Sequence, residues 1–188
     1  MATFIIFGSG KGSNALNLLT KFKDHPKVKI AALVSDKPRR GFLDLSYQFR
    51  INLEMIKGPE LADSKWINHL KLTYRPDYIL LLGFLQKVPA ELLQAFPGKI
   101  INLHPALLPA FGGEGMYGAK VHKAVLESGV KQSGITLHVV DEEYDRGEIL
   151  QQYACDVLPN DDVNSLAERI HSLEHEMIPG FVEQLANQ

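Results

Sequence analysis

Short apolar runs alternate with amphipathic stretches along the first half of the chain, and this alternation is the strongest constraint on the fold. The runs have the length and composition of buried strands and cover residues 3–7, 28–34, 53–56, 78–82 and 99–104. Apolar residues recur at helical spacing in the stretches 15–22, 66–74 and 89–96, the last with proline at its first position. This order predicts an α/β fold, a doubly wound, mostly parallel sheet with flanking helices.

The second half has a different pattern. It predicts a helix at 119–128 and strands at 134–140 and 149–157, with an acidic loop at 141–147 between the strands. A last helix is expected to begin after a cap at Asp161 and Asp162 and to carry a single apolar stripe. Pro179 should kink or end this helix, because proline removes a backbone hydrogen bond.

Composition and charge exclude several classes of protein. The 188 residues carry a formal net charge of −2, which gives no basic footprint for nucleic acid. The sequence has no apolar run of about twenty residues and no cationic flank near Met1, so we expect a soluble, cytoplasmic protein that binds no membrane. Cys155 is the single cysteine, which excludes an internal disulfide and a cysteine-based zinc site.

The run that ends at His104 carries polar residues on one face. Side chains alternate along a strand, so Asn102 and His104 point one way while Ile101 and Leu103 point the other. Asn102 could merely satisfy a turn and His104 could be a core histidine. However, a loop rich in proline and glycine follows, and ligands of parallel sheets bind at the carboxyl ends of strands. The pair therefore predicts an active site.

The acidic loop supplies a carboxylate for this site. Gly147 closely follows Asp145, as in a tight loop that turns one carboxylate inward. In the preceding strand, Thr136 and His138 share a face, which adds a second imidazole near this end of the sheet. A carboxylate near His104 should raise the pKa of that histidine. An amide, an imidazole and a carboxylate without a nucleophile suit acyl transfer to a substrate that brings its own nucleophile.

A glycine-rich loop, Gly8-Ser9-Gly10-Lys11-Gly12-Ser13-Asn14, follows the first predicted strand. A dinucleotide fingerprint would need glycine where Ser13 stands, although Asp36 occupies a suitable place for a ribose contact. A Walker loop is excluded because Lys11 precedes the last glycine. A nest of backbone N–H groups at a helix start, suited to one phosphate, remains. A tight turn capped by Ser13 explains the loop equally well.

The last predicted helix contains His171, Glu174 and His175 in the spacing of the inverted zinc metalloproteases. Such a site needs a third ligand well downstream, where Glu183 is the only acidic residue beyond the adjacent Glu176. A chance match is therefore the favoured interpretation, and no metal site is predicted. Glu174 lies at the edge of the apolar stripe, so its carboxylate should face a partner such as an amine or hydroxyl of a ligand.

Together these segments resemble the phosphoribosylglycinamide formyltransferases, also called glycinamide ribonucleotide transformylases. The matching segments, in the order of the family, are Gly8 to Asn14, the Asn-x-His-Pro-x-Leu-Leu-Pro run at 102–109, the Thr-Leu-His-Val-Val run at 136–140, and Asp145-Arg146-Gly147. The resemblance spans essentially the whole chain and implies a formyltransferase-type, Rossmann-like fold. It implies one domain, 1–188, with a nucleotide-phosphate-binding half at 1–104 and a folate and catalytic half at 105–188.

The resemblance also implies a reaction, the transfer of a formyl group from 10-formyltetrahydrofolate to the amine of 5-phosphoribosylglycinamide in purine synthesis, without a metal. Asn102 and protonated His104 would bind the oxyanion, and Asp145 would orient His104 and relay the proton. The substrate would be held by Gly12, Ser13 and Asn14 at its phosphate and by Glu174 at its glycinamide or ribose end. The folate pocket would be formed by Leu85, Gln86, Lys87, Val88 and Asn102. The chain departs from the commoner family pattern at Gln86, where arginine often stands, and in the loop 112–117.

Three alternatives share part of this pattern. Methionyl-tRNA formyltransferases resemble the chain with an additional C-terminal domain, and formyltetrahydrofolate hydrolases resemble it with an additional N-terminal domain. A non-catalytic nucleotide-binding module would explain the glycine loop but not Asn102, His104 and Asp145 together. A need for a phosphorylated amine acceptor discriminates among these functions. The sequence leaves a homodimer open.

Overall fold

A computed structural model describes residues 1–37 and 40–188 as an α/β structure with a mixed sheet. The sheet has seven strands in the order β3-β2-β1-β4-β5-β6-β7. The chain divides into two compact units, the first formed by residues 1–101 and 178–188 and the second by residues 102–177. Strand β5 (Ile100–His104) begins in the first unit and ends in the second.

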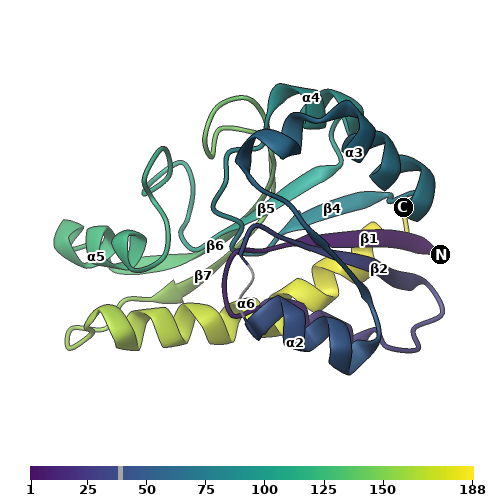
Figure 1. Ribbon diagram of the computed structural model, residues 1–188. Coiled ribbons are helices and arrows are strands. Elements are labelled where there is room, and N and C mark those ends of the chain that lie inside the picture. Colours follow the sequence, from purple (N-terminus) through teal and green to yellow (C-terminus); the bar gives the residue numbers. More distant parts are fainter. Residues whose placement is uncertain (38–39) are drawn as a thin grey trace. The chain divides into compact units, whose positions relative to one another are not determined.

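The first unit alternates strands and helices, as predicted. Its strands are β1 (Ala2–Phe7), β2 (Val28–Ser35), β3 (Asn52–Met55) and β4 (Tyr78–Leu81). Its helices are α1 (Ser13–Lys21), α2 (Arg40–Phe49), α3 (Ser64–His69), which a π-helical turn at Leu70–Tyr74 extends, and α4 (Ala90–Ala95), with a 3-10 turn at Gly58–Ala62. The pairs β1–β2, β1–β4 and β2–β3 are parallel. Helices α3 and α4 lie on one face of these strands and α2 on the other (Figure 1), which confirms the doubly wound arrangement.

Two details of the first unit differ from the sequence-based expectation. The sequence pattern predicts no helix at 40–49, yet α2 buries Phe42 and Leu45. Their three-residue spacing is a helical signal, but it is too short a pattern to stand out beside the proline and arginines that precede it. Pro89 is not the first residue of α4 but its N-cap, because its ψ of 157° is extended.

The second unit contains α5 (Ala119–Ser128), β6 (Gln132–Val139), β7 (Ile149–Asp156) and most of α6 (Val163–Leu185). Strands β6 and β7 pair antiparallel, with a register irregularity between Leu137 and His138. Helix α6 begins as predicted, because Asp162 Oδ1 accepts a 2.8 Å hydrogen bond from the Ser165 backbone N–H. It does not end at Pro179. Buried residues on both sides of the proline, Ile178 and Val182, keep this part of the helix packed.

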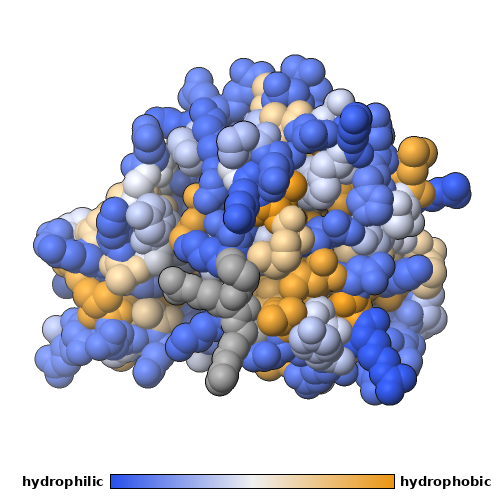
Figure 2. Space-filling view, in the orientation of Figure 1, coloured by the Kyte–Doolittle hydropathy of each residue, from blue (hydrophilic) through white to orange (hydrophobic). Residues whose placement is uncertain are grey.

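The surface is largely hydrophilic on the face shown in Figure 2, with apolar residues in small groups. Exposed apolar side chains include Tyr47 and Leu72 in the first unit and Tyr117 in the second. Scattered apolar residues of this kind are normal on a protein surface. In the part of the chain that the structure describes, no helix has both the length and the apolar character needed to cross a membrane.

Candidate active site

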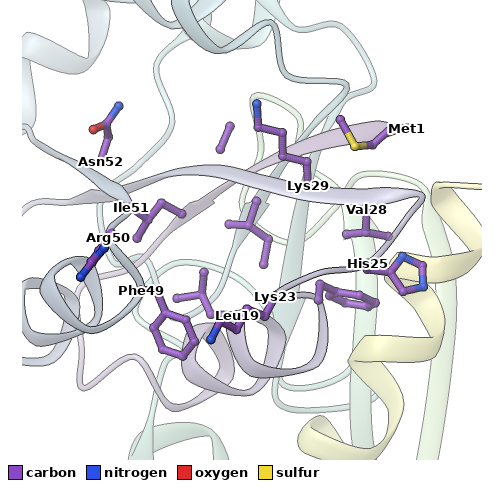
Figure 3. A pocket seen from close by; sticks show the side chains of 13 residues that line it. Met1, Leu19, Lys23, His25, Val28, Lys29, Phe49, Arg50, Ile51 and Asn52 are labelled. Atoms are coloured by element: carbon purple, nitrogen blue, oxygen red, sulfur yellow. The ribbon is translucent and has the colours of Figure 1, made fainter.

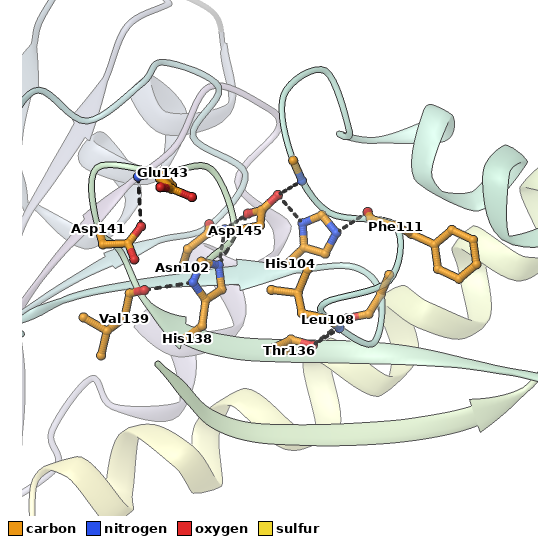
Figure 4. A network of polar contacts seen from close by, with 12 residues as sticks. Asn102, His104, Leu108, Phe111, Thr136, His138, Val139, Asp141, Glu143 and Asp145 are labelled. Atoms are coloured by element: carbon orange, nitrogen blue, oxygen red, sulfur yellow. Dashed lines mark hydrogen bonds and ion pairs between the residues drawn. The ribbon is translucent and has the colours of Figure 1, made fainter. Parts of the chain in front are cut away.

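Two of the predicted residues, Asn102 and His104, lie on strand β5 in the second unit. Asn102 and His104 alternate with Leu103, so their side chains leave the same face of the strand, as the sequence predicts. His104 is buried, with 3 % of its surface exposed. Asp145 lies beside both side chains, and Figure 4 shows the three turned toward one another. The predicted catalytic residues are therefore brought together.

Asp145 is held by the loop that follows β5. Its Oδ2 accepts a 2.9 Å hydrogen bond from the backbone N–H of Gly113 and lies 3.5 Å from Nδ1 of His104. The side chains of His104 and Asp145 are 4 % and 11 % exposed. Asp145 has a φ of 55°, in the left-handed region that residues other than glycine seldom adopt. Such backbone conformations concentrate at functional sites.

His138 on β6 completes the cluster, and it lies at the end of the sheet where the sequence predicts a second imidazole. Its Nδ1 lies 2.9 Å from the carbonyl oxygen of Val139, which can only accept, so Nδ1 carries the proton. In the neutral ring, Nε2 therefore accepts a 3.0 Å hydrogen bond from the amide Nδ2 of Asn102. The same amide nitrogen lies 3.5 Å from Asp145 Oδ1. This arrangement orients the Asn102 amide with its nitrogen toward Asp145 and His138 (Figure 4).

The second nitrogen of His104 faces the backbone of the same loop. Nε2 donates a 2.8 Å hydrogen bond to the carbonyl oxygen of Phe111, whose φ is 58°. Burial lowers the pKa of His104, and the Coulomb interaction with Asp145 and the hydrogen bond to Phe111 only partly oppose this effect. The prediction that the pKa of His104 is raised is therefore wrong in its net direction. Asp145 raises the pKa of His104, as expected, but burial lowers this pKa by more.

The carboxyl group of Asp145 keeps its charge in this site. His138 Nε2 lies 3.5 Å from Asp145 Oδ1 and can donate to it when the ring is protonated. Burial raises the pKa of Asp145, but the contacts with His138, with His104 and with the N–H of Gly113 outweigh burial, and the net pKa is lowered. The cluster thus combines an ionised carboxylate, an imidazole that burial favours in the neutral form, and an oriented amide. It can donate hydrogen bonds to a developing oxyanion and accept a proton from an attacking group.

The glycine loop lies in the first unit and ends at the start of α1. Gly12 is the N-cap, with a φ of 79° that favours glycine, and Ser13 is the first residue of the helix. Gly12 therefore occupies the N-cap position, and Ser13 is one residue further along. The hydroxyl of Ser9 accepts a 3.0 Å hydrogen bond from the backbone N–H of Leu85. The predicted phosphate residues thus sit at a helix N-terminus.

The predicted folate-binding segment at 85–88 also lies in the first unit. Leu85 is 47 % exposed, whereas Val88 is buried. The amide Nε2 of Gln86 donates a 3.0 Å hydrogen bond to Asp36 Oδ2. The side chain that departs from the commoner family pattern therefore has a partner within its own unit.

The remaining predicted residue, Glu174, lies half-buried on α6 in the second unit. On the same helix the rings of His171 and His175 have centroids 4.1 Å apart. Within the described residues, no group of three or more histidine, cysteine, aspartate or glutamate side chains is arranged to hold a metal ion. Helical spacing accounts for the pairing of these two histidines.

A cavity of about 410 Å³ lies in the first unit, away from the predicted phosphate loop. Lys23, His25, Lys29 and Arg50 are among the residues that line it (Figure 3). The cavity is at the amino ends of β1 and β2, whereas the glycine loop follows the carboxyl end of β1. We therefore assign it no part in the candidate active site.

Comparisons with known proteins agree with these observations. A family model described as formyl transferase matches residues 2–182. The chain is 54 % identical over 178 residues to the chloroplastic phosphoribosylglycinamide formyltransferase of Arabidopsis thaliana, covering 92 % of this chain and 61 % of that protein. It is 35 % identical over 191 residues to phosphoribosylglycinamide formyltransferase of Bacillus subtilis, covering 98 % and 95 %. The chain thus spans about three fifths of the length of its plant relatives from Arabidopsis thaliana and Vigna unguiculata.

Solved structures have the same fold. The crystal structure of phosphoribosylglycinamide formyltransferase from Anaplasma phagocytophilum matches with a TM-score of 0.88 at 32 % identity, covering 99 % of this chain and 87 % of that one. Glycinamide ribonucleotide transformylase 1 from Geobacillus kaustophilus matches with a TM-score of 0.87 at 31 % identity, covering 99 % of each chain. The family model covers nearly the whole sequence. The chain therefore belongs to the formyl transferase family.

Proposed function

We propose that the protein transfers a formyl group from 10-formyltetrahydrofolate to the primary amine of 5-phosphoribosylglycinamide, a step of purine synthesis. The observation that carries this proposal is the buried cluster of Asn102, His104 and Asp145, which offers hydrogen-bond donors and a carboxylate without a nucleophile of its own. Relatives and solved structures that bear the name of this activity support it.

In the proposed reaction, the acceptor amine attacks the formyl carbon and the formyl oxygen becomes an oxyanion. One N–H of Asn102 is engaged by His138 at 3.0 Å, whereas the approach to Asp145 is long, at 3.5 Å. The second N–H of Asn102 is therefore the donor available to the oxyanion. Negative charge developing near His104 favours its imidazolium form, so its pKa rises as the reaction proceeds.

Asp145 has two roles in this proposal. Its carboxylate opposes the effect of burial on His104 and thereby lowers the cost of protonating the ring. Because its own pKa is lowered, Asp145 is ionised at neutral pH and accepts the proton that the attacking amine loses, through water. The bond between the folate nitrogen and the formyl carbon then breaks, and the folate nitrogen takes up that proton.

Each part of the two substrates is assigned to its own residues. Gly12, Ser13 and Asn14 bind the phosphate, because backbone N–H groups at the start of a helix attract anions. Glu174 binds the glycinamide or ribose end. The folate donor is bound by the segment 85–88 together with Asn102. In this proposal residues 1–104 and 105–188 are halves of one functional domain, of which the first contains the phosphate loop and the second contains Asp145.

The proposed partners are small molecules, and the proposed location is the cytoplasm. The formal net charge of −2 argues against binding to nucleic acid. The relatives from Arabidopsis thaliana and Vigna unguiculata are named as chloroplastic proteins, whereas the name of the Bacillus subtilis relative gives no compartment.

The experiment that tests the proposal is a formyl-transfer assay on the purified protein, followed by the absorbance of the released folate. We expect turnover with phosphoribosylglycinamide and none when it is omitted. The dephosphorylated acceptor, used at the same concentration, should react far more slowly if Gly12, Ser13 and Asn14 bind phosphate. Folate release without any acceptor would instead indicate a hydrolase, and no release under any condition would indicate a binding module.

A further inference from the structure

Leu108, in the loop that follows His104, is held through both of its backbone polar groups. Its N–H donates a 3.0 Å hydrogen bond to Oγ1 of Thr136 on β6. Its carbonyl oxygen accepts a 2.8 Å hydrogen bond from Nε2 of Gln152 on β7. Two neighbouring strands therefore fix the two peptide groups on either side of Leu108, in a loop that forms no helix or strand.

The Thr136 hydroxyl is fully used in this arrangement. It donates a 2.6 Å hydrogen bond to the carbonyl oxygen of Ala106 and accepts from Leu108 and, at 2.9 Å, from Nε2 of Gln152. One donor and two acceptor sites are all that a hydroxyl possesses. Thr136 and Ala106 are fully buried, so either group has no access to water if it loses its partner, whereas Gln152 is itself exposed. The geometry around Leu108 is therefore tightly specified.

The same loop reaches both catalytic side chains within five residues of Leu108. The carbonyl oxygen of Phe111 accepts the Nε2–H of His104, and the N–H of Gly113 donates to Asp145. Between them, Gly112 is packed so closely that a Cβ there would lie 2.5 Å from Leu108 Cδ2 and 3.0 Å from Asp145 Cβ. A displacement of Leu108 is thus transmitted to the groups that contact His104 and Asp145.

We propose that Gln152 and Thr136 are positioning residues for His104 and Asp145, acting through the backbone of Leu108 and the loop at 109–113. This inference rests on the proposed function, in which His104 and Asp145 carry the chemistry. The side chains of Thr136 and Gln152 bond to each other and to the backbone of Ala106 and Leu108, so their action on His104 and Asp145 passes through the loop. Their effect is to fix where the Phe111 carbonyl and the Gly113 N–H stand.

The pKa of His104 separates this role from simple support of the fold. The titratable groups around this ring are Asp145, His138 and His122. The hydrogen bond to Phe111 raises the pKa of His104 against the effect of burial. If the loop loses its anchor, the Phe111 carbonyl moves away and the pKa of His104 falls further. A substitution that only weakened the fold would leave this pKa unchanged in the folded protein.

The test is a nuclear magnetic resonance titration of the histidine rings in the whole protein, with Gln152→Leu beside the wild type. Gln151→Leu is the matched control, because Gln151 adjoins Gln152 on β7 and its side chain points to the opposite face of the sheet. We expect the pKa of His104 to fall by about half a unit or more in Gln152→Leu and to stay at the wild-type value in Gln151→Leu.

A second pair of variants guards against poor folding of Gln152→Leu. Thr136→Val keeps the shape but loses the hydroxyl, whereas Thr136→Ser keeps the hydroxyl. The pKa of His104 should fall in Thr136→Val and be restored in Thr136→Ser. In the formyl-transfer assay, kcat should fall about tenfold in Gln152→Leu and Thr136→Val while the KM for the acceptor changes less than about twofold.

The outcomes separate this inference from the proposed function. A wild-type pKa of His104 in folded Gln152→Leu and Thr136→Val would overturn the positioning role, whatever the activity. A lowered pKa in these variants would support the role even if the wild type transferred no formyl group, because the titration needs no turnover. A fall of kcat with an unchanged pKa would also contradict it, since the loop would then act by another route.

Discussion

The molecule has a histidine–carboxylate pair in each unit, and the distance between the two groups does not predict which pair lies in the candidate active site. In the first unit, His69 Nε2 lies 3.1 Å from Glu54 Oε1, and the two side chains are 44 % and 25 % exposed. In the second unit, His104 Nδ1 lies 3.5 Å from Asp145 Oδ2, and the side chains are 4 % and 11 % exposed. The longer contact is the buried one, and only the buried one lies in the candidate active site.

The partners of the two pairs explain the difference. Around Glu54 and His69, the further partners are side chains of the adjoining π-helical turn. The Tyr74 hydroxyl donates a 2.5 Å hydrogen bond to Glu54, and Thr73 Oγ1 lies 3.1 Å from His69 Nδ1. Around His104 and Asp145, the partners include the backbone of a loop with left-handed residues. The first arrangement links β3 to α3 and the π-helical turn that follows it, whereas the second holds polar groups where burial would otherwise disfavour them.

The largest expected effect comes from removing the buried imidazole. His104→Ala should lower kcat for formyl transfer by about 10²- to 10⁴-fold, because it removes the imidazole whose protonated form stabilises the oxyanion. His69→Ala is the matched control and should keep the wild-type rate. The measurement is steady-state folate release at neutral pH, with circular dichroism to verify folding. A wild-type rate in His104→Ala would refute the assigned role.

The next effect concerns the amide beside that imidazole. Asn102→Ala should lower kcat by about 10²- to 10³-fold, the usual loss when one oxyanion donor is removed. Asn164→Ala, on the exposed side of α6, serves as the control and should behave as the wild type. The same assay gives both values. If the KM for the acceptor rose while kcat stayed constant, Asn102 would be a binding residue and not an oxyanion donor.

Alternation along β5 explains why the sequence could predict Asn102 and His104. Two polar residues two positions apart must share a face, and the proline and glycines that follow place them at a strand end. Asp145 could be predicted because Gly147 allows a tight turn. Both predictions rest on the local geometry of a strand and of a turn.

The net effect on the pKa of His104 could not be predicted in the same way, because it depends on how deeply the ring is buried and not on its neighbours in the sequence. The partner of His104 Nε2 is the backbone carbonyl of Phe111, and a pattern of side chains in the sequence does not predict a backbone partner. The role of His138 follows from its tautomer, which the Val139 carbonyl sets through space. Helix α2 was missed because only Phe42 and Leu45 mark its buried face by their spacing.

A smaller effect is expected from acid on stability. Burial lowers the pKa of His104 and His122, so the folded protein binds fewer protons than the unfolded chain as pH falls below about 6.5. The free energy of unfolding should therefore fall on acidification through this range. The free energy of unfolding should fall again below the ordinary pKa of an aspartate. The pKa of Asp145 is lowered in the folded protein, so the unfolded chain again binds more protons there.

Melting temperatures measured from pH 7.5 down to pH 5 test this expectation. The loss should be about 2–4 °C for each kcal/mol of stability lost. His122→Gln should flatten the profile, because one buried group no longer changes its charge. A melting temperature that rose on acidification would show that these histidines are charged in the folded protein.

The smallest effect is expected at the exposed pair. Glu54→Gln should leave kcat unchanged and lower the free energy of unfolding by at most about 1 kcal/mol, because exposed ion pairs contribute little. Burial and Glu54 together raise the pKa of Tyr74 to about 12. In Glu54→Gln this pKa should fall but stay above the ordinary value, because burial remains. An alkaline titration of tyrosinate absorbance measures it, with Glu176→Gln on α6 as the control. A loss of turnover in Glu54→Gln comparable to that of His104→Ala would mean that the exposed pair is functional as well, and the contrast between the two units would have to be abandoned.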